Sequence, residues 1–232
     1  MTSREQPFDD RVRLLVELAH GPRVLNLGAC GNTRPEGDGR RRFVQAALVG
    51  AGFSVVGADL NAAGVEWLGR SGFEAVCMDA QAIPAEGEAF DSIVAGELIE
   101  HLEDPGAFLR GAARRLKPEG RLVLSTPQPF SPVHFVQYLA NPAIANEEHT
   151  CYFDLQTLGQ LLQRCGFEIV EVRFVNDVRP EEGNWRMQLL CRLGLIGTSL
   201  LPARFRTTVV VAARLRQRTD FERRGDAAQW GR

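Results

Sequence analysis

Strand-like apolar runs alternate with stretches of helical spacing along most of the chain, and this alternation constrains the fold more than any other feature. The first five strand-like runs, between residues 23 and 127, alternate with such helical stretches. Parallel strands need long crossover connections, which are usually helices. We therefore expect an α/β fold with a doubly wound parallel sheet covered by helices on both faces. The expected strands cover residues 23–27, 53–60, 73–80, 90–97, 118–127, 168–175 and 206–215.

The length of the chain permits one sizeable domain. With 232 residues, of which 44 % are apolar and 24 % charged, the composition is that of an ordinary soluble globular protein. We expect a single domain over residues 1–216. Residues 217–232 are polar, which predicts a disordered tail.

Charge, cysteine content and hydropathy disfavour several classes of protein. A net charge of −2 offers no strongly basic face, so nucleic acid is not expected as the main partner. The first residues contain no apolar core of signal-peptide length, and no window reaches the roughly 18 apolar residues of a membrane-spanning helix. Five scattered cysteines without C-x-x-C spacing indicate a reduced, cytoplasmic chain with neither a zinc site nor a disulfide framework.

Two segments interrupt the alternation of strands and helices. Residues 126–152 are too long and too aromatic for a simple connector, which favours a lid-like segment that covers a substrate. Residues 176–205 form an insertion, and the stretch 187–201 within it is strongly apolar. A helix packed on the domain is the first interpretation of that stretch, and a dimer face or a membrane-surface contact are the alternatives. We expect a monomer or a homodimer.

The first expected strand leads into a glycine-rich turn, which is typical of a site for a nucleotide-like ligand. In VLNLGACG (residues 24–31), two glycines let the backbone turn sharply at the carboxyl end of the strand. The following strands deliver Asp59, then Asp79, then Glu97 to the same edge of the sheet. One carboxylate can accept hydrogen bonds from both hydroxyls of a ribose, and another suits the amino group of adenine. Nothing in this set provides for a pyrophosphate.

These motifs occur together, and in this order, in one known family. The segments VLNLGACG, VVGADL, CMDAQAIP and FDSIVAGELIEHLEDPGAFLRGAARRLKPEGRLVLSTP resemble the motifs of class I S-adenosylmethionine-dependent methyltransferases. The small-molecule branch related to the ubiquinone-pathway O-methyltransferases is the most similar, and EHTCYFDLQTLGQLLQRCGFEIVEV resembles its ending. The resemblance spans roughly residues 20–214. It implies a Rossmann-like, mostly parallel seven-stranded sheet whose last strand is antiparallel.

The resemblance also implies S-adenosylmethionine as cofactor and S-adenosylhomocysteine as product. The glycine turn would approach the methionine part and Asp59 would hold the ribose. The Asp79–Ala80 pair would hold the adenine, and Glu97 would lie near the reactive methyl group. The implied cofactor residues are Asn26, Gly28, Ala29, Asp59, Leu60, Asp79, Ala80 and Glu97.

Position 26 departs from the family pattern. The family usually has an aspartate there, which orders the amino group of the methionine part, and this chain has Asn26. An amide keeps an acceptor but loses the charge. Asn26→Asp is therefore expected to tighten cofactor binding or to leave it unchanged. Cys30 and Asn32 stand where the family has its second and third glycines, so the turn is expected to have an altered shape.

A general base is expected if the methyl acceptor is a hydroxyl group. His101 follows the fourth strand, and His149 lies in the lid-like segment, so these two are the candidate catalytic residues. His134 is interpreted as a loop residue, and His20 precedes the first strand. The spacing of Glu97, Glu100 and His101 matches a triplet that binds a divalent cation in some ubiquinone-pathway methyltransferases, but we expect no metal here.

The function expected from the sequence is transfer of a methyl group to a small-molecule acceptor, most plausibly to an oxygen atom. A nicotinamide-dependent oxidoreductase is one alternative, although it requires G-x-G-x-x-G and an acid about 20 residues later. Here Asp59 follows Gly28 by 31 positions. The other alternative is a non-catalytic cofactor-binding or scaffold protein that keeps the fold.

Overall fold

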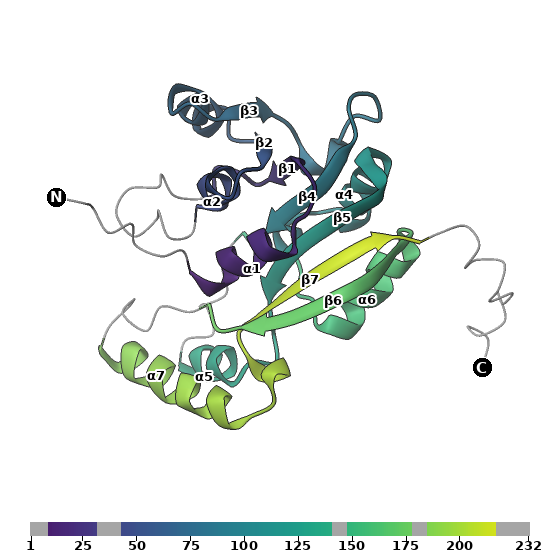
Figure 1. Cartoon of the computed structure of the whole chain (residues 1–232). Helices are drawn as coiled ribbons and strands as arrows, with labels where there is room; N and C mark the ends of the chain where they lie inside the picture. The colour runs from purple at the N-terminus through teal and green to yellow at the C-terminus, as the bar shows by residue number, and fades with distance from the viewer. Residues whose placement is uncertain (1–8, 32–42, 141–147, 178–184, 217–232) are drawn as a thin grey trace, which may run out of the picture.

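The computed structural model describes residues 9–31, 43–140, 148–177 and 185–216. Within these residues, seven strands form one sheet in the order β3-β2-β1-β4-β5-β7-β6, with helices on both sides (Figure 1). The strands are β1 (Arg23–Leu27), β2 (Ser54–Asp59), β3 (Glu74–Cys77), β4 (Phe90–Gly96), β5 (Leu116–Pro127), β6 (Phe167–Val175) and β7 (Thr208–Leu215). The expected tail, residues 217–232, lies outside the described residues.

The sheet is parallel except at β7, which confirms the topology that the resemblance implied. β1 pairs in parallel with β2 and β4, β2 with β3, and β4 with β5. β7 is antiparallel to both of its neighbours, β5 and β6. The strand order reverses between β1 and β4, and ligands of doubly wound sheets bind outside the carboxyl ends of the strands at such a switch point.

Helices cover the two faces of the sheet as expected. They are α1 (Asp10–Leu18), α2 (Val44–Gly50), α3 (Ala62–Arg70), α4 (Pro105–Arg115), α5 (Pro132–Ala140), α6 (Leu155–Arg164) and α7 (Trp185–Leu200). Short 3₁₀ turns are η2 (Ala80–Ala82), η3 (Ile99–His101) and η4 (Ala203–Phe205). Asn61, Asp104 and Asp154 cap α3, α4 and α6, because each side chain accepts a hydrogen bond from a backbone N–H of the first turn.

Two apolar clusters, one on each face of the sheet, hold the layers together. On one face, α4 and α6 insert Phe108, Leu109 and Leu158 against the strands. On the other face, Leu15 of α1 and Leu48 of α2 pack against the strands. All five are fully buried, so each contributes roughly 1.5–3 kcal/mol of transfer free energy. Because both faces of the sheet are buried, polar side chains of the strands are expected at its carboxyl edge.

Three expectations about local structure need correction or refinement. His134, which was interpreted as a loop residue, lies on α5 within the lid-like segment 126–152; residues 141–147 of that segment are outside the described part. The strand expected over 118–127 begins two residues earlier, at Leu116, directly after α4 ends at Arg115. The stretch 187–201 is helical, as α7. No helix among the described residues is long and apolar enough to cross a membrane.

Candidate functional site

The glycine turn after β1 is closed tightly against the neighbouring strands. Gly28 has a φ of 70°, a conformation that favours glycine, and its N–H donates to the carbonyl of Ala58 at 2.9 Å. A Cβ atom at Gly28 would lie only 3.3 Å from the side chain of Leu98. The turn therefore brings the ends of β1, β2 and β4 together with bare backbone at their meeting point. Its continuation over residues 32–42 lies outside the described residues.

Asp59, at the end of β2, is hydrogen-bonded to the turn. Its Oδ2 accepts from the backbone N–H of Cys30 at 2.8 Å, and its Oδ1 accepts from that of Asn61 at 2.9 Å. These two bonds tie the end of β2 to the glycine turn and to the start of α3. An ionised carboxylate offers about four lone-pair sites, so capacity for a ribose remains. Leu60, directly after Asp59, is 66 % exposed.

The Asn26 side chain is buried and paired with a second amide, so it does not line the edge of the sheet at which the cofactor is expected. It is 1 % exposed, and its Nδ2 donates to Oε1 of the fully buried Gln45 on α2 at 2.9 Å. An amide at position 26 can therefore donate the hydrogen bond that Gln45 accepts, which a carboxylate could not. A carboxylate here would face the carbonyl oxygen of Gln45 unless that amide turned over.

Asp79 follows β3 and caps the 3₁₀ turn η2. Its Oδ1 accepts from the N–H of Gln81 at 2.8 Å. Asp79 and Asp59 lie on neighbouring strand ends, because the backbone N–H of Met78 donates to the carbonyl of Asp59 at 3.0 Å. Ala80 is buried at the start of the turn. These positions lie at the carboxyl edge of the sheet, as the sequence order predicted.

Glu97 has the most unusual backbone of the site. It directly follows β4 and is the one non-glycine residue with positive φ (50°) in the described part of the chain. Such a conformation is uncommon outside glycine, and it is held here by hydrogen bonds from the Glu97 N–H to the carbonyl and hydroxyl oxygens of Ser125. Arg11 of α1 approaches from the other side, with its Nε 3.8 Å from Glu97 Oε1 and 2.6 Å from Asp177 Oδ2.

The two candidate bases, His101 and His149, meet although 48 positions separate them. The Thr150 N–H donates to the carbonyl of Glu100 at 2.9 Å, and the Thr150 hydroxyl donates to that of Leu102 at 2.7 Å. These bonds hold residues 149–151 against η3, and the two imidazole rings lie edge to face with centroids 4.6 Å apart. The lid-like segment therefore does reach the edge of the sheet at this point.

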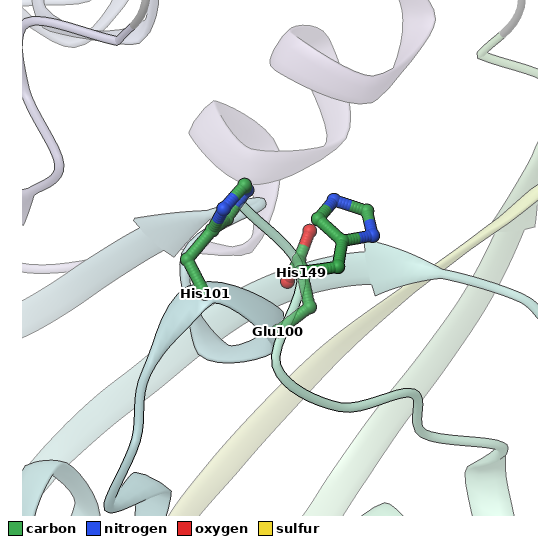
Figure 2. A group of neighbouring side chains, drawn as sticks. All are labelled: Glu100, His101 and His149. Atoms are coloured by element: carbon green, nitrogen blue, oxygen red, sulfur yellow. The ribbon is translucent and has the colours of Figure 1, made fainter. Parts of the chain in front are cut away.

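Glu100 lies between these histidines and completes a group of three (Figure 2). Its carboxyl group is fully buried, and neither oxygen has a well-formed hydrogen bond, although the Thr126 hydroxyl is close by. Burial and the nearby charge of Glu97 raise the pKa of Glu100 to about 8. Burial and the charge of His101 lower the pKa of His149, which favours the neutral imidazole.

The same three side chains are the ones that could share a metal ion. One ligand atom from each lies within 4.8 Å of the others. The triplet that the sequence suggested included Glu97, and the structure places His149 in the group instead. Two imidazoles and one carboxylate suit a transition metal better than magnesium, which prefers oxygen ligands. The expectation that no metal is used stays a prediction.

Unpartnered polar atoms around this group are the feature that sequence reasoning missed. Among the described residues, seven have buried side-chain atoms with no hydrogen-bond partner, and all but Arg23 lie around the ends of β4 and β5. The six are Arg11, Glu100, Thr126, Gln128, Ser131 and His149. Buried polar groups are normally paired, so this set indicates the place of a polar ligand. The small polar residues directly after β5 were a readable signal of it.

Residues 4–172 match the model of a protein family described as a methyltransferase domain. This match covers more than half of the chain, and the strand order and the glycine turn agree with it. The chain belongs to the class I, S-adenosylmethionine-dependent methyltransferase family. The alternative interpretation, that the chain is a nicotinamide-dependent oxidoreductase, is thereby excluded.

Relatives of this methyltransferase include ubiquinone biosynthesis O-methyltransferases. That of Parvibaculum lavamentivorans is 44 % identical over 55 residues, which are 24 % of this chain and 22 % of the relative. That of Xanthomonas oryzae pv. oryzae is 34 % identical over 117 residues, which are 50 % of this chain and 47 % of the relative. The chain therefore spans at most about half the length of these curated relatives.

Solved structures agree on the fold of the methyltransferase. A possible histamine N-methyltransferase from Thermotoga maritima has a TM-score of 0.64 at 17 % identity, covering 89 % of this chain and 88 % of its own. A 1,6-didemethyltoxoflavin-N1-methyltransferase from Burkholderia thailandensis, solved with its substrate and S-adenosylhomocysteine, has a TM-score of 0.55 at 20 % identity. It covers 90 % of this chain and 79 % of its own.

Proposed function

We propose that this methyltransferase transfers the methyl group of S-adenosylmethionine to an oxygen atom of a small-molecule acceptor. The observation that carries the proposal is the pairing of His101 with His149 beside the buried Glu100, at the end of β4. Relatives named as O-methyltransferases support the choice of oxygen. A hydroxyl or carboxyl group is the acceptor that this arrangement suits.

The cofactor would lie along the carboxyl edge from β3 to β4. Gly28 and Ala29 would approach its methionine part with backbone, and Asp59 and Leu60 would contact its ribose. Asp79 and Ala80 would contact its adenine. Bound there, S-adenosylmethionine supplies a methyl group on a positively charged sulfur, and Glu97 would be the carboxylate near that charge. Asn26 is buried and bonded to Gln45, so we do not expect it to contact the cofactor directly.

His149 would accept the proton of the acceptor hydroxyl. Its lowered pKa favours the neutral imidazole, and its buried Nδ1 has no hydrogen-bond partner among the residues that the structure describes. His101, in ring contact with it, would orient the imidazole or serve as the base itself. A general base contributes roughly 10²–10⁴-fold, and orientation of the reactants supplies most of the remaining acceleration.

Turnover measured as S-adenosylhomocysteine formation tests the proposal with a panel of phenols, alcohols, carboxylates and amines. His149→Ala should lower turnover with a hydroxyl acceptor by ~10²–10⁴-fold, most at low pH. His20→Ala is the matched control, because His20 lies at the opposite edge and contacts the carbonyl of Glu119. A larger loss in His101→Ala would move the base to that residue.

The same assay separates the remaining alternatives. Cofactor binding without turnover on any acceptor would mean a non-catalytic protein of the same fold. Loss of turnover after dialysis against a chelator, restored by a divalent ion, would overturn the expectation that no metal is used. Full turnover in both histidine variants at all pH values would show that no histidine is the base.

A cytoplasmic location remains part of the proposal, supported by five cysteines of which none forms a disulfide.

A further inference from the structure

The chain between β5 and α5 makes a tight turn that is held by its backbone. The Ser131 N–H donates to the carbonyl of Gln128 at 3.2 Å, which closes a β-turn between these two residues. His134 Nδ1 donates to the same carbonyl at 2.9 Å, and the Gln128 N–H donates to the carbonyl of Thr207 at 2.7 Å. The Ser131 carbonyl accepts from the N–H of Phe135 at 3.0 Å. The backbone groups at both ends of the turn are therefore all hydrogen-bonded.

The side-chain oxygens at the two ends of this turn have no such partners. Gln128 is 4 % exposed and Ser131 is fully buried, and neither Gln128 Oε1 nor Ser131 Oγ has a hydrogen-bond partner among the described residues. Ser131 directly precedes α5, where a serine hydroxyl normally accepts from a backbone N–H of the first turn. Leaving a buried polar atom unpartnered costs free energy, so the fold gains nothing from the polarity of these two side chains.

The two residues are neighbours in space and lie beside the proposed site of methyl transfer. The Cα atoms at the ends of a β-turn are less than about 7 Å apart, so Gln128 and Ser131 are close together. Thr126 has a third unpartnered hydroxyl, and it lies on the same side of the extended chain as Gln128, two positions later. The Thr126 hydroxyl is close to Glu100, one of the three side chains in Figure 2. The unpartnered atoms thus lead from that group to the turn.

The two atoms at the turn suit an uncharged group that both donates and accepts a hydrogen bond. Gln128 Oε1 accepts and the Ser131 hydroxyl can donate, so one hydroxyl group of a ligand would satisfy both. A carboxylate has no hydrogen to give to Oε1. Residues 126–140 also contain no aspartate, glutamate, lysine or arginine. Arg11, which is buried at the same edge of the sheet, is paired with Asp177. A charged group enclosed at the turn would therefore be costly to bury.

We propose that Gln128 and Ser131 are specificity-determining residues, which bind a hydroxyl group of the methyl acceptor other than the oxygen that is methylated. That the bound molecule is a methyl acceptor rests on the proposed function. The acceptor is then a compound with two hydroxyl groups, one beside His149 and the other at the turn. Since both atoms are enclosed, some of the side chains around them must move to admit it. A site built in this way rejects an analogue without the second hydroxyl, because its buried atoms then stay unpaired.

Calorimetric titration of the full chain, with S-adenosylhomocysteine present, tests this proposal without requiring turnover. The probes form an aromatic and an aliphatic series. The first consists of phenol, resorcinol and benzoate, and the second of cyclohexanol with its diol and carboxylate counterparts. In at least one series we expect the diol to bind at least about tenfold more tightly than the mono-ol and the carboxylate.

Gln128→Met and Ser131→Ala remove the two polar atoms with little change of shape. Each variant should bind the diol and the mono-ol about equally. Because the removed atoms had no partners, both variants should unfold at the same temperature as the wild-type chain or at a higher one. Ser92→Ala is the matched control, since the buried Ser92 hydroxyl accepts from the His20 N–H at 2.9 Å and donates to the His20 carbonyl at 2.8 Å. This control should unfold at a lower temperature and keep the preference for the diol.

A wild-type chain that binds the diols no better than the mono-ols, or that binds none of the probes, would overturn the proposal. So would an unchanged preference in the two variants, or a loss of stability in both that equals the loss in Ser92→Ala. If Gln128→Met does not fold, Ser131→Ala decides alone. Failure of the proposed function has a different signature. The preference for the diol and its loss in the variants would then remain, but no S-adenosylhomocysteine would form from S-adenosylmethionine and the same diols.

Discussion

At the scale of single residues, Asp59 is bonded to the glycine turn and is proposed to bind the ribose, so one substitution would affect both stability and cofactor affinity. Asp59→Ala removes a charged acceptor from the proposed ribose site, so S-adenosylmethionine affinity should fall by ~2–4 kcal/mol. It also removes two hydrogen bonds to backbone N–H groups, so unfolding should become easier by roughly 1–3 kcal/mol. Calorimetric titration below the melting temperature measures the first effect, and thermal unfolding measures the second.

Asp104→Ala is the control for this experiment. Asp104 caps α4 by accepting from the N–H of Ala107 at 2.8 Å, so its loss should cost a similar stability, about 1 kcal/mol, without changing cofactor affinity. If the affinity of folded Asp59→Ala equals that of the wild-type chain, Asp59 is a turn residue only.

At Asn26 the structure favours a different outcome of substitution from the one that the resemblance suggests. The resemblance suggested that Asn26→Asp would tighten cofactor binding or leave it unchanged. In the structure this amide is buried and bonded to Gln45. A carboxylate there would have a raised pKa, so Asn26→Asp should destabilise the fold more at pH 8 than at pH 5, by roughly 1–3 kcal/mol. Unfolding at the two pH values measures this, and a gain in affinity without loss of stability would contradict it.

The positions of the residues at the strand ends were predictable because the sheet pattern fixes them. Strand ends of a parallel sheet meet at one edge, so Gly28, Asp59 and Asp79 could be placed from their order alone. Their partners could not, since the contact of Asp59 with Cys30 depends on the shape of an irregular turn. The meeting of His149 with His101 depends likewise on backbone hydrogen bonds of Thr150, which no local pattern indicates.

At the scale of elements, α7 illustrates where sequence periodicity stops being informative. Its residues are apolar on two sides, so the sequence could not distinguish a buried helix from a contact surface. The structure resolves this because Gly194 faces α5 whereas nothing lies within 4 Å of a Cβ atom at Gly197. Two glycines of one helix thus have opposite roles.

The same substitution at both glycines should give changes of opposite sign. Gly197→Ala should stabilise the protein by roughly 0.5–1 kcal/mol, because alanine is the better helix former and meets open space. Gly194→Ala gains the same propensity, but overpacking against Val133 costs about 1–3 kcal/mol, so a net loss is expected. Urea unfolding of the two variants compares them directly, and equal stability would mean that α5 and α7 are not packed as described.

At the scale of the whole molecule, the burial of Glu100 couples the site to folding. This carboxyl is fully buried, and its pKa of about 8 lies well above the usual value for glutamate. The folded state thus binds a proton that the unfolded state releases near pH 4.5. Stability should therefore fall as the pH rises from about 4.5 to about 8, since Glu100 must either remain protonated or ionise in a buried place.

Glu100→Gln tests this coupling because an amide has a similar shape and no titration. The variant should match the wild-type chain at pH 4.5 and exceed its stability at pH 8 by a few kcal/mol, on the order of 2–4. Asp91→Asn is the opposite control. A hydrogen bond from Lys117 lowers the pKa of Asp91, so the wild-type aspartate stabilises the fold above its unfolded pKa, and its loss should cost more at neutral than at acidic pH. Denaturant unfolding across this range measures both variants.

If Glu100→Gln is no more stable than the wild-type chain at pH 8, the negative charge of the buried carboxylate is neutralised by a partner in solution. A divalent ion held with His101 and His149 is then the first candidate, and unfolding repeated with a chelator identifies it.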